Sequence, residues 1–319
     1  MNRTGITPRL MKFSQVVTRK MVGGTCQVSV LLSTLMGGVS GSAVADATME
    51  ARILGPEMTR KGYPKGYSCA VLCLTSLITA TIPPSLGLIL YGFIGNVSIG
   101  RLFIAGLIPG ILMCLVLMLT VWWTSKRYHY DIPDPTVATP TGKEIAASAK
   151  ECFFALVFPV LLIVLIRMGL CTSTEAGAVA VAYALLCGTA IYHELTWDGF
   201  VTALVDSVVD TGGIILIIAM SGIFSHALTV EQVPAVLGSM LLGLTDNPQL
   251  MIIYIILFLT ATGMFVDSNV NVLLFTPLVL PVLTSMGVDP VHFGIIMMTI
   301  VTMGCMTPPV GTACYSVCD

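Results

Sequence analysis

The chain has 319 residues, of which 55% are hydrophobic and only 10% are charged. Its mean hydropathy is +0.92, whereas soluble globular domains carry about 25% charged residues. The composition excludes a soluble globular domain and predicts an all-α polytopic protein of the lipid bilayer. With a net charge of −2 and no basic stripe outside short loops, nucleic acid is not an expected partner.

The basic residues are unevenly distributed along the chain. All 15 Lys and Arg lie at or before Arg167, and the 152 residues after it contain none. The loop at 56–65 is basic, which places it in the cytoplasm, while its counterpart around Gly287 has no basic residue and is expected outside. Two related units in opposite orientation form an inverted-topology repeat.

A polar motif occurs twice within the apolar sequence. Each copy has a small Gly-rich break with an acidic residue, Asp46 in the first and Asp267 in the second, and a later Pro-Pro pair. Ionisable residues and broken helices in apolar sequence indicate a transporter site at a repeat interface. The stretches are G-G-V-S-G-S-A-V-A-D (37–46) with I-P-P-S (82–85), and T-G-M-F-V-D-S-N (262–269) with T-P-P-V-G (307–311).

The first repeat is expected to begin with a re-entrant hairpin. The apolar stretch 21–37 is shorter than the roughly 20 residues that a span needs, so it forms one arm of a hairpin whose tip is S-G-S. Pro83 and Pro84 then interrupt an apolar run and free carbonyl groups to face a ligand. The first repeat, 1–124, thus comprises a hairpin at 21–55, a broken span at 66–95 and a plain span at 102–123.

The second repeat follows a cytoplasmic linker at 125–152, which contains a short interfacial helix. Glu175 is expected to cap the helix that begins beside it, because acidic residues favour the first turn. The second repeat, 153–319, is expected to contain spans at 153–170, 176–192 and 212–228, a shorter apolar segment at 233–245, a hairpin at 250–285 and a broken span at 290–318.

The two acidic residues of the motif are candidate cation ligands. A charged Asp at membrane depth costs about 2.5–3.5 kcal/mol on insertion scales, so two of them beside Gly-rich breaks favour an ion-binding role for Asp46 and Asp267. The alternative is helix capping or a structural salt bridge. Ser40 and Ser42 flank Gly41 and add hard oxygen ligands, which suit an alkali cation.

The same breaks are candidate sites for an anion. Helix N-termini near a break present positive dipole ends, although a packing turn that only ends two helices is the alternative. Ser268 and Asn269 are candidate substrate contacts, and Asn271 follows on the same side. The Pro-Pro breaks contribute Thr81, Ser85, Thr307 and Gly311 as further candidate ligands.

A remote alternative comes from the first hairpin tip. Gly38-Val39-Ser40-Gly41 fits the G-x-S-G loop of intramembrane serine proteases. That chemistry requires a His base beside the Ser, and the sequence nominates none.

The chain resembles the large membrane subunit of tripartite ATP-independent periplasmic (TRAP) transporters, the DctM/SiaM-like permeases. The similar stretches occur in family order and cover nearly the whole chain. They are S-G-S-A-V-A-D (40–46), I-P-P-S (82–85) with Y-G (91–92), L-F-I-A-G-L-I-P-G (102–110), S-T-E-A-G-A (173–178), G-M-F-V-D (263–267), T-P-L-V-L-P (276–281), G-V-D-P-V-H-F-G (287–294) and T-P-P-V-G (307–311).

The resemblance implies an elevator-type secondary transporter in the bacterial inner membrane. Na⁺ would drive uptake of an organic anion, such as a dicarboxylate or sugar acid, delivered by a periplasmic binding protein, and a small four-helix membrane subunit would be the second partner. Family members have further spans before residue 1 and after T-P-P-V-G, so the chain is expected to be a piece of a longer protein. A binding-protein-independent dicarboxylate or citrate carrier is the alternative.

The resemblance also assigns residues to sites. One Na⁺ site would use Ser40, Ser42 and Asp46 with the break at Pro83 to Ser85. The other would use Gly263 and Asp267 with Thr307 to Gly311. Substrate would lie between the tips, in contact with Ser40, Gly41, Pro83, Ser268, Asn269 and Pro308.

Overall fold

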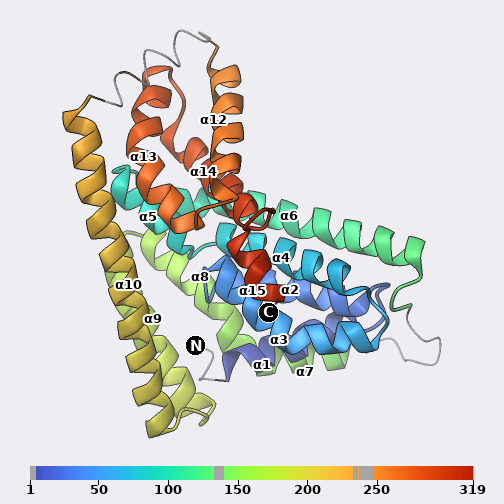
Figure 1. The fold of residues 1–319 in the computed structure, drawn as a ribbon. Coiled ribbons are helices and arrows are strands. Elements are labelled where there is room, and N and C mark those ends of the chain that lie inside the picture. The colour runs from blue at the N-terminus through green and yellow to red at the C-terminus, as the bar shows by residue number, and fades with distance from the viewer. Residues whose placement is uncertain (1–4, 133–139, 233–235, 237–246, 319) are drawn as a thin grey trace.

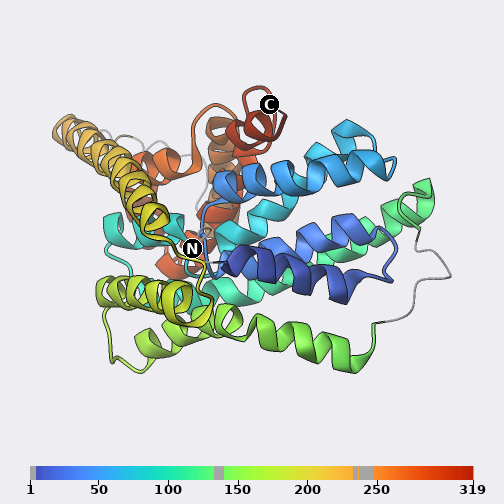
Figure 2. The same ribbon diagram turned by 90° about the horizontal axis from the view of Figure 1, so that it is seen from below.

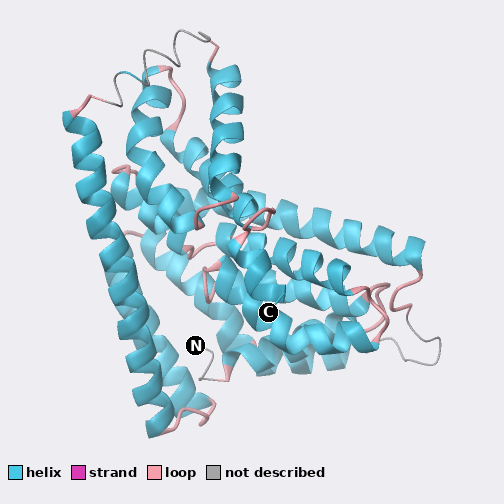
Figure 3. Ribbon diagram, viewed as in Figure 1, coloured by secondary structure: helices cyan, strands magenta, loops and turns pink. Residues whose placement is uncertain are grey.

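The computed structural model describes residues 5–132, 140–232, 236 and 247–318, and these residues contain helices and loops but no strand (Figure 3). Four of the described helices are long and apolar enough to cross a membrane, and two bent helix pairs bring the number of possible spans to six. The chain is therefore an all-α polytopic membrane protein, as its composition predicts.

The described elements are helices connected by loops (Figure 1). In chain order they are α1 (Ile6–Thr18), α2 (Gly24–Gly37), α3 (Ala43–Arg60), α4 (Lys65–Thr81), α5 (Leu86–Ile94), α6 (Ile99–Tyr128), α7 (Gly142–Glu151), α8 (Phe153–Arg167), α9 (Ser173–Leu186), η2 (Cys187–Ile191), α10 (Trp197–Val230), α12 (Pro248–Gly263), α13 (Ser268–Ser285), α14 (Pro290–Cys305) and α15 (Thr312–Cys318).

The first hairpin consists of α2 and α3, and its tip is the loop 38–42. Helices α4 and α5 follow and are bent by 46° at the Pro-Pro break, where the Pro83-Pro84 bond is cis. Proline cannot donate the backbone hydrogen bond that would continue α4. The side chain of Ser85 restarts the helix, because it accepts a hydrogen bond from the Leu88 amide as an N-cap of α5.

The second half repeats this order with α12, α13, α14 and α15. Its hairpin tip is the loop 264–267, and its break carries a second cis bond at Pro308-Pro309. Asp289 caps α14 by accepting from the amides of Val291 and His292. The His292 amide contributes most to holding the pKa of this carboxyl below its usual value.

The two halves interlock. Helix α2 packs against α4 and α12 packs against α14, whereas α5 packs against α13 and α15 packs against α3. The hydroxyl of Tyr91 on α5 also donates to the carbonyl of Pro290 at 2.7 Å, across a separation of 199 residues. A large apolar core of residues from both halves results, and Figure 2 shows helices of the two halves side by side. Opposite orientation of the halves in the membrane stays a prediction.

Helix α10 contains the span expected at 212–228 and extends it toward the N-terminus. It is a single helix of 34 residues that begins at Trp197. No proline lies between Trp197 and Val230, so none interrupts the helix. The segment 233–245, apart from Val236, and linker residues 133–139 lie outside the described residues.

Helices α7 to α10 connect the two halves. Helices α7 and α8 bend by 63°, which separates the expected interfacial helix from the span that follows it. Glu175 forms a capping box with Thr172 at the start of α9, so its predicted capping role is confirmed. Helix α10 runs along one side of the molecule (Figure 1) and packs against α13.

Candidate functional site

The first hairpin tip is joined to the first Pro-Pro break by the backbone. The Leu86 amide donates to the Gly41 carbonyl at 3.3 Å. Gly41 has a φ of 61°, and a Cβ built on it would lie 2.3 Å from the Pro84 carbonyl oxygen. Glycine is therefore required where the tip meets the break.

The second tip and the second break are joined in the same way. The Gly311 amide donates to the Met264 carbonyl at 3.1 Å, and Gly311 has a φ of 51°. The Cys305 thiol adds a bond of 3.4 Å to the Val266 carbonyl. No hydrogen bond in the described part of the chain joins one tip to the other, so the residues brought together form two junctions, one in each repeat.

The two junctions differ in exposure. Gly41, Pro83 and Ser85 are buried in the first, and only Ser40 is exposed. Pro308 is exposed in the second. A cavity of about 500 Å³ opens beside Ser40, between the first tip and helices α9 and α10, and it gives the expected substrate contact at Ser40 an accessible face.

Asp46 lies inside the protein rather than at the tip. It is on the first turn of α3 and is 1% exposed. The Thr79 hydroxyl on α4 donates to Asp46 Oδ2 at 2.5 Å, while Oδ1 is buried without a hydrogen-bond partner. A bare buried carboxylate oxygen is unfavourable unless a cation or a donor meets it.

Asp267 occupies a different helical position. It is the N-cap of α13 and accepts a hydrogen bond from the Asn269 amide at 2.9 Å. The N-cap of α3 is Ser42, so Ser42, not Asp46, corresponds to Asp267, and the expected equivalence of the two Asp residues is wrong. Ser42 precedes Pro83 by 41 positions and Asp267 precedes Pro308 by 41, whereas Asp46 precedes Pro83 by 37.

The residue that corresponds to Asp46 is Asn271, since each lies four positions after its N-cap. Asn271 is fully buried. Its Nδ2 donates to the Val266 carbonyl at 3.1 Å, and its Oδ1 has no partner. Each hairpin thus holds one unpaired side-chain acceptor at the same helical position.

Three of the five buried side-chain oxygens without partners in the described residues lie on helices that begin at a tip or a break. Thr312 Oγ1, at the start of α15, joins Asp46 Oδ1 and Asn271 Oδ1. Oxygen ligands from a hairpin and a broken helix are the donor set that transporters use for Na⁺. These residues therefore fit an alkali cation, with Asp46 supplying the charge in the first repeat and Asp267 in the second.

The remaining predicted residues have local roles in the structure. The Thr307 hydroxyl donates to the Met303 carbonyl at 2.8 Å. Ser42 caps α3 without a side-chain hydrogen bond, which leaves its hydroxyl available. Gly263 lies against the backbone of Gly304, where helices α12 and α14 cross, so any contribution to a site comes from its carbonyl group. Ser268 is buried and Asn269 partly buried.

A carboxylate that the sequence did not single out lies one turn beyond Asp46. Glu50 on α3 is fully buried and accepts hydrogen bonds from three hydroxyls, those of Ser29, Ser33 and Thr75. The sequence carries one indication of this residue: Glu50 lies four positions after Asp46, and residues at that spacing share a helix face.

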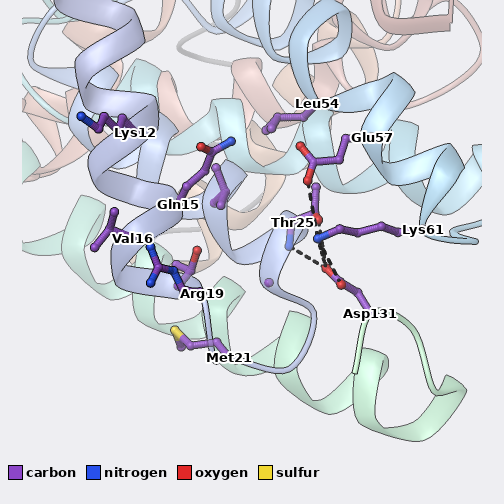
Figure 4. A pocket seen from close by; sticks show the side chains of 13 residues that line it. Lys12, Gln15, Val16, Arg19, Met21, Thr25, Leu54, Glu57, Lys61 and Asp131 are labelled. Carbon is purple, nitrogen blue, oxygen red and sulfur yellow. Dashed lines mark hydrogen bonds and ion pairs between the residues drawn. The ribbon is translucent and has the colours of Figure 1, made fainter. Parts of the chain in front are cut away.

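A second unpredicted residue, Asp131, closes the other end of the hairpin. Its carboxylate accepts from the Thr25 amide and hydroxyl at 2.9 Å each and pairs with Lys61 at 3.2 Å. Figure 4 shows this group in a cavity of about 540 Å³, with Arg19 and Glu57 also on its wall. Thr25 is near the start of α2, so this cavity lies roughly 20 Å from the tip along the helix.

A family model described as "Tripartite ATP-independent periplasmic transporter, DctM component" matches residues 1–319. This chain belongs to the DctM family of TRAP transporter permeases. It is 35% identical over 317 residues to the sialic acid TRAP transporter large permease protein SiaM of Vibrio cholerae, a match that covers 99% of this chain and 73% of SiaM.

Other relatives of this DctM-type chain are named for different cargoes. The 2,3-diketo-L-gulonate TRAP transporter large permease protein YiaN of Escherichia coli is 34% identical, with 98% of this chain and 72% of YiaN covered. The isethionate TRAP transporter permease protein DctMQ of Oleidesulfovibrio alaskensis is 31% identical, with 98% and 48% covered.

Membership in the DctM family has direct consequences. Members of this family are transporter permeases and not enzymes, so the interpretation of Ser40 as the nucleophile of a serine protease is rejected. Family membership also implies two kinds of partner, a small membrane subunit and a periplasmic binding protein.

Proposed function

We propose that this TRAP permease is the membrane core of a Na⁺-coupled importer of an organic anion in the bacterial inner membrane. A periplasmic binding protein would deliver the anion, a carboxylate such as a dicarboxylate or sugar acid, and a small four-helix subunit would complete the membrane complex. The observation that carries the proposal is the pair of unpaired buried oxygens, Asp46 Oδ1 and Asn271 Oδ1, at equivalent positions of the two hairpins.

The first step of the mechanism is cation binding at the two junctions. A Na⁺ ion at the first junction would draw on Ser40, Ser42 and Ser85 from the tip and the break, and Asp46 on the first turn of α3 would supply negative charge. A second ion at Asp267 would draw on the carbonyl of Gly263, the Thr307 hydroxyl and the backbone of Gly311. Each ion would stiffen the backbone link between a tip and its break, Leu86 to Gly41 or Gly311 to Met264.

Ordering of the tips would then create the anion site. Helices α3, α5 and α13 all begin at a tip or a break, and their N-terminal amides favour negative charge. No Lys or Arg follows Arg167, so the second hairpin and the second break have no Lys or Arg side chain for a carboxylate. Substrate would lie against Ser40, Gly41, Ser268 and Asn269, near Pro83 and Pro308, and a rigid-body elevator movement would carry it across.

Uptake into proteoliposomes that contain the whole complex tests this function. Carboxylates are screened with the binding protein present and a Na⁺ gradient imposed, and choline replaces Na⁺ in the control. The expected result is uptake that requires both Na⁺ and the binding protein. Uptake without the binding protein would instead support a binding-protein-independent carrier. Full uptake by a variant with both Asp46→Ala and Asp267→Ala would refute the assigned Na⁺ sites.

A further inference from the structure

Asp46 and Glu50 form a buried carboxylate pair in the stem of the first hairpin. They are the acidic side chains that are almost fully buried among the described residues, at 1% and 0% exposure. Both lie on α3 and are four positions apart, so they share one face of the helix on consecutive turns. Glu50 is eight positions beyond the N-cap Ser42, which places it roughly 12 Å from the tip.

Hydroxyl groups from two neighbouring helices complete the surroundings of this pair. Helix α2 contributes Ser29 and Ser33, and α4 contributes Thr75 and Thr79, again at spacings of four. Three helices therefore present two oxygen-bearing side chains each on consecutive turns. We call these six residues the stem cluster: Ser29, Ser33, Asp46, Glu50, Thr75 and Thr79.

The contacts within the stem cluster are specific. Ser33 donates to Glu50 Oε1 at 2.8 Å, and the Ser33 carbonyl accepts from Thr79, the residue whose hydroxyl also contacts Asp46. Ser29 donates to Glu50 Oε2, and the Ser29 and Thr75 hydroxyls are 2.9 Å apart. These hydrogen bonds stabilise the negative charge on Glu50 and leave hydroxyl lone pairs free to meet a cation.

The charge of the pair is not balanced by a basic side chain. The ion pairs of the described residues involve Arg9, Lys12, Arg19, Lys61 and Arg101, and none of them reaches Asp46 or Glu50. Two like charges on adjacent turns of a buried helix face are strongly unfavourable unless a cation or a proton neutralises one of them.

Asp46 Oδ1 marks the place that a positive charge would take. This oxygen is fully buried and has no hydrogen-bond partner, although Thr79 bonds the other oxygen of the same carboxylate. Every hydroxyl of the stem cluster is already committed as a donor. A bound cation would satisfy Oδ1 and leave these hydrogen bonds in place.

We propose that the stem cluster binds a monovalent cation between Asp46 and Glu50, with Ser33 and Thr75 as neutral ligands. This position is deeper in the hairpin than the two tip junctions. A dehydrated ion of low charge fits better than Mg²⁺ or Ca²⁺, because Mg²⁺ keeps several waters and Ca²⁺ takes six to eight oxygens. The coupling role of this ion rests on the proposed function, but its binding does not.

Cation-dependent thermal unfolding of the purified membrane complex tests the proposal without any substrate. Unfolding is followed in increasing NaCl, with choline chloride keeping the ionic strength constant, and with KCl and CaCl₂ as competing series. Wild-type protein is expected to be stabilised by Na⁺ with a saturating midpoint. Glu50→Gln, which keeps the shape but removes the charge, should raise that midpoint about 10- to 100-fold.

Two further variants make the result decisive. Glu57→Gln on the same helix is the matched control, because Glu57 pairs with Lys61 outside the stem cluster, and it should leave the midpoint unchanged. Thr75→Val removes one hydroxyl with little change in volume and should also raise the midpoint, which answers the question if Glu50→Gln does not fold. An unchanged midpoint in folded Glu50→Gln, or stabilisation by Ca²⁺ in place of Na⁺, would overturn the proposal.

The outcome separates this inference from the proposed transport function. Na⁺-driven uptake together with an unaltered Glu50→Gln midpoint would refute the stem site and leave the transport function intact. If Glu50→Gln raises the Na⁺ midpoint of thermal unfolding but the complex imports no carboxylate, the stem site is supported and the transport function is refuted.

Discussion

Gly263 and Gly304 bring the backbones of α12 and α14 into direct contact. A Cβ built on Gly304 would lie 2.7 Å from the Gly263 Cα, and one built on Gly263 would lie 3.0 Å from the Gly304 Cα. The contact is adjacent to the second tip, which begins one residue after Gly263. The distance between α12 and α14 at this point therefore depends on the absence of a side chain at both Gly263 and Gly304.

Replacement of Gly304 by Ala is expected to force these helices apart and to displace the second tip. Overpacking of this kind costs about 1–3 kcal/mol, so the variant should lose transport and unfold at a lower temperature. Gly222→Ala on α10, where a Cβ meets nothing within 4 Å, is the control and should keep both properties. Wild-type uptake by Gly304→Ala would show that the crossing tolerates a wider separation.

Gly41→Ala is expected to break the link between the first tip and the first break. The left-handed φ of 61° alone costs a side chain about 1–2 kcal/mol, and the clash with the Pro84 carbonyl adds to it. Na⁺-dependent uptake should be lost. The Ala variant at Gly55, which has open space around it, should transport normally, and equal activity of the two variants would contradict this account.

Asn271 gives a direct test of the repeat register. Asn271→Leu keeps the approximate shape but removes the unpaired oxygen, so the Na⁺ concentration for half-maximal uptake should rise about tenfold or more. Asn271→Asp keeps the oxygen and should retain Na⁺ dependence. Asn269→Ala is the comparison, since the hydrogen bond of Asn269 to Asp267 comes from its backbone amide; it should alter the substrate KM rather than the Na⁺ response.

Asp131→Ala is expected to loosen the base of the first hairpin. Its carboxylate accepts two hydrogen bonds from Thr25 and pairs with Lys61 while only 14% of its side chain is exposed. Loss of charged hydrogen bonds of this type costs about 1.5–3 kcal/mol, which a thermal unfolding measurement detects. Lys61→Gln should cost less, about 1 kcal/mol or below, because that partner is more exposed.

The sequence predicted the hairpins and breaks because Gly and Pro mark them locally. The tip at Gly41 and the break at Pro83 follow from backbone chemistry that does not depend on distant residues. The expected contact between each tip and its own break is present as a hydrogen bond in both repeats. The membrane class followed from composition alone.

The site was predicted less completely, for a physical reason. Asp46 and Asp267 are both aspartates, but they occupy different positions in their helices. Asp267 is the N-cap of α13, whereas the N-cap of α3 is Ser42. Glu50 was missed because its partners Ser29 and Thr75 lie 21 and 25 positions away. No local pattern reveals that three helices converge on one carboxylate.

The packing of α5 on α13 and of α15 on α3 has a consequence for biosynthesis. The first half of the chain lacks its covering helix until α13 emerges, 174 positions after Ile94. At synthesis rates of 5–20 residues per second, that interval is about 10–35 s. During it, α3 also lacks α15, which packs against it in the complete structure, so the first half must wait in the membrane as an incomplete structure.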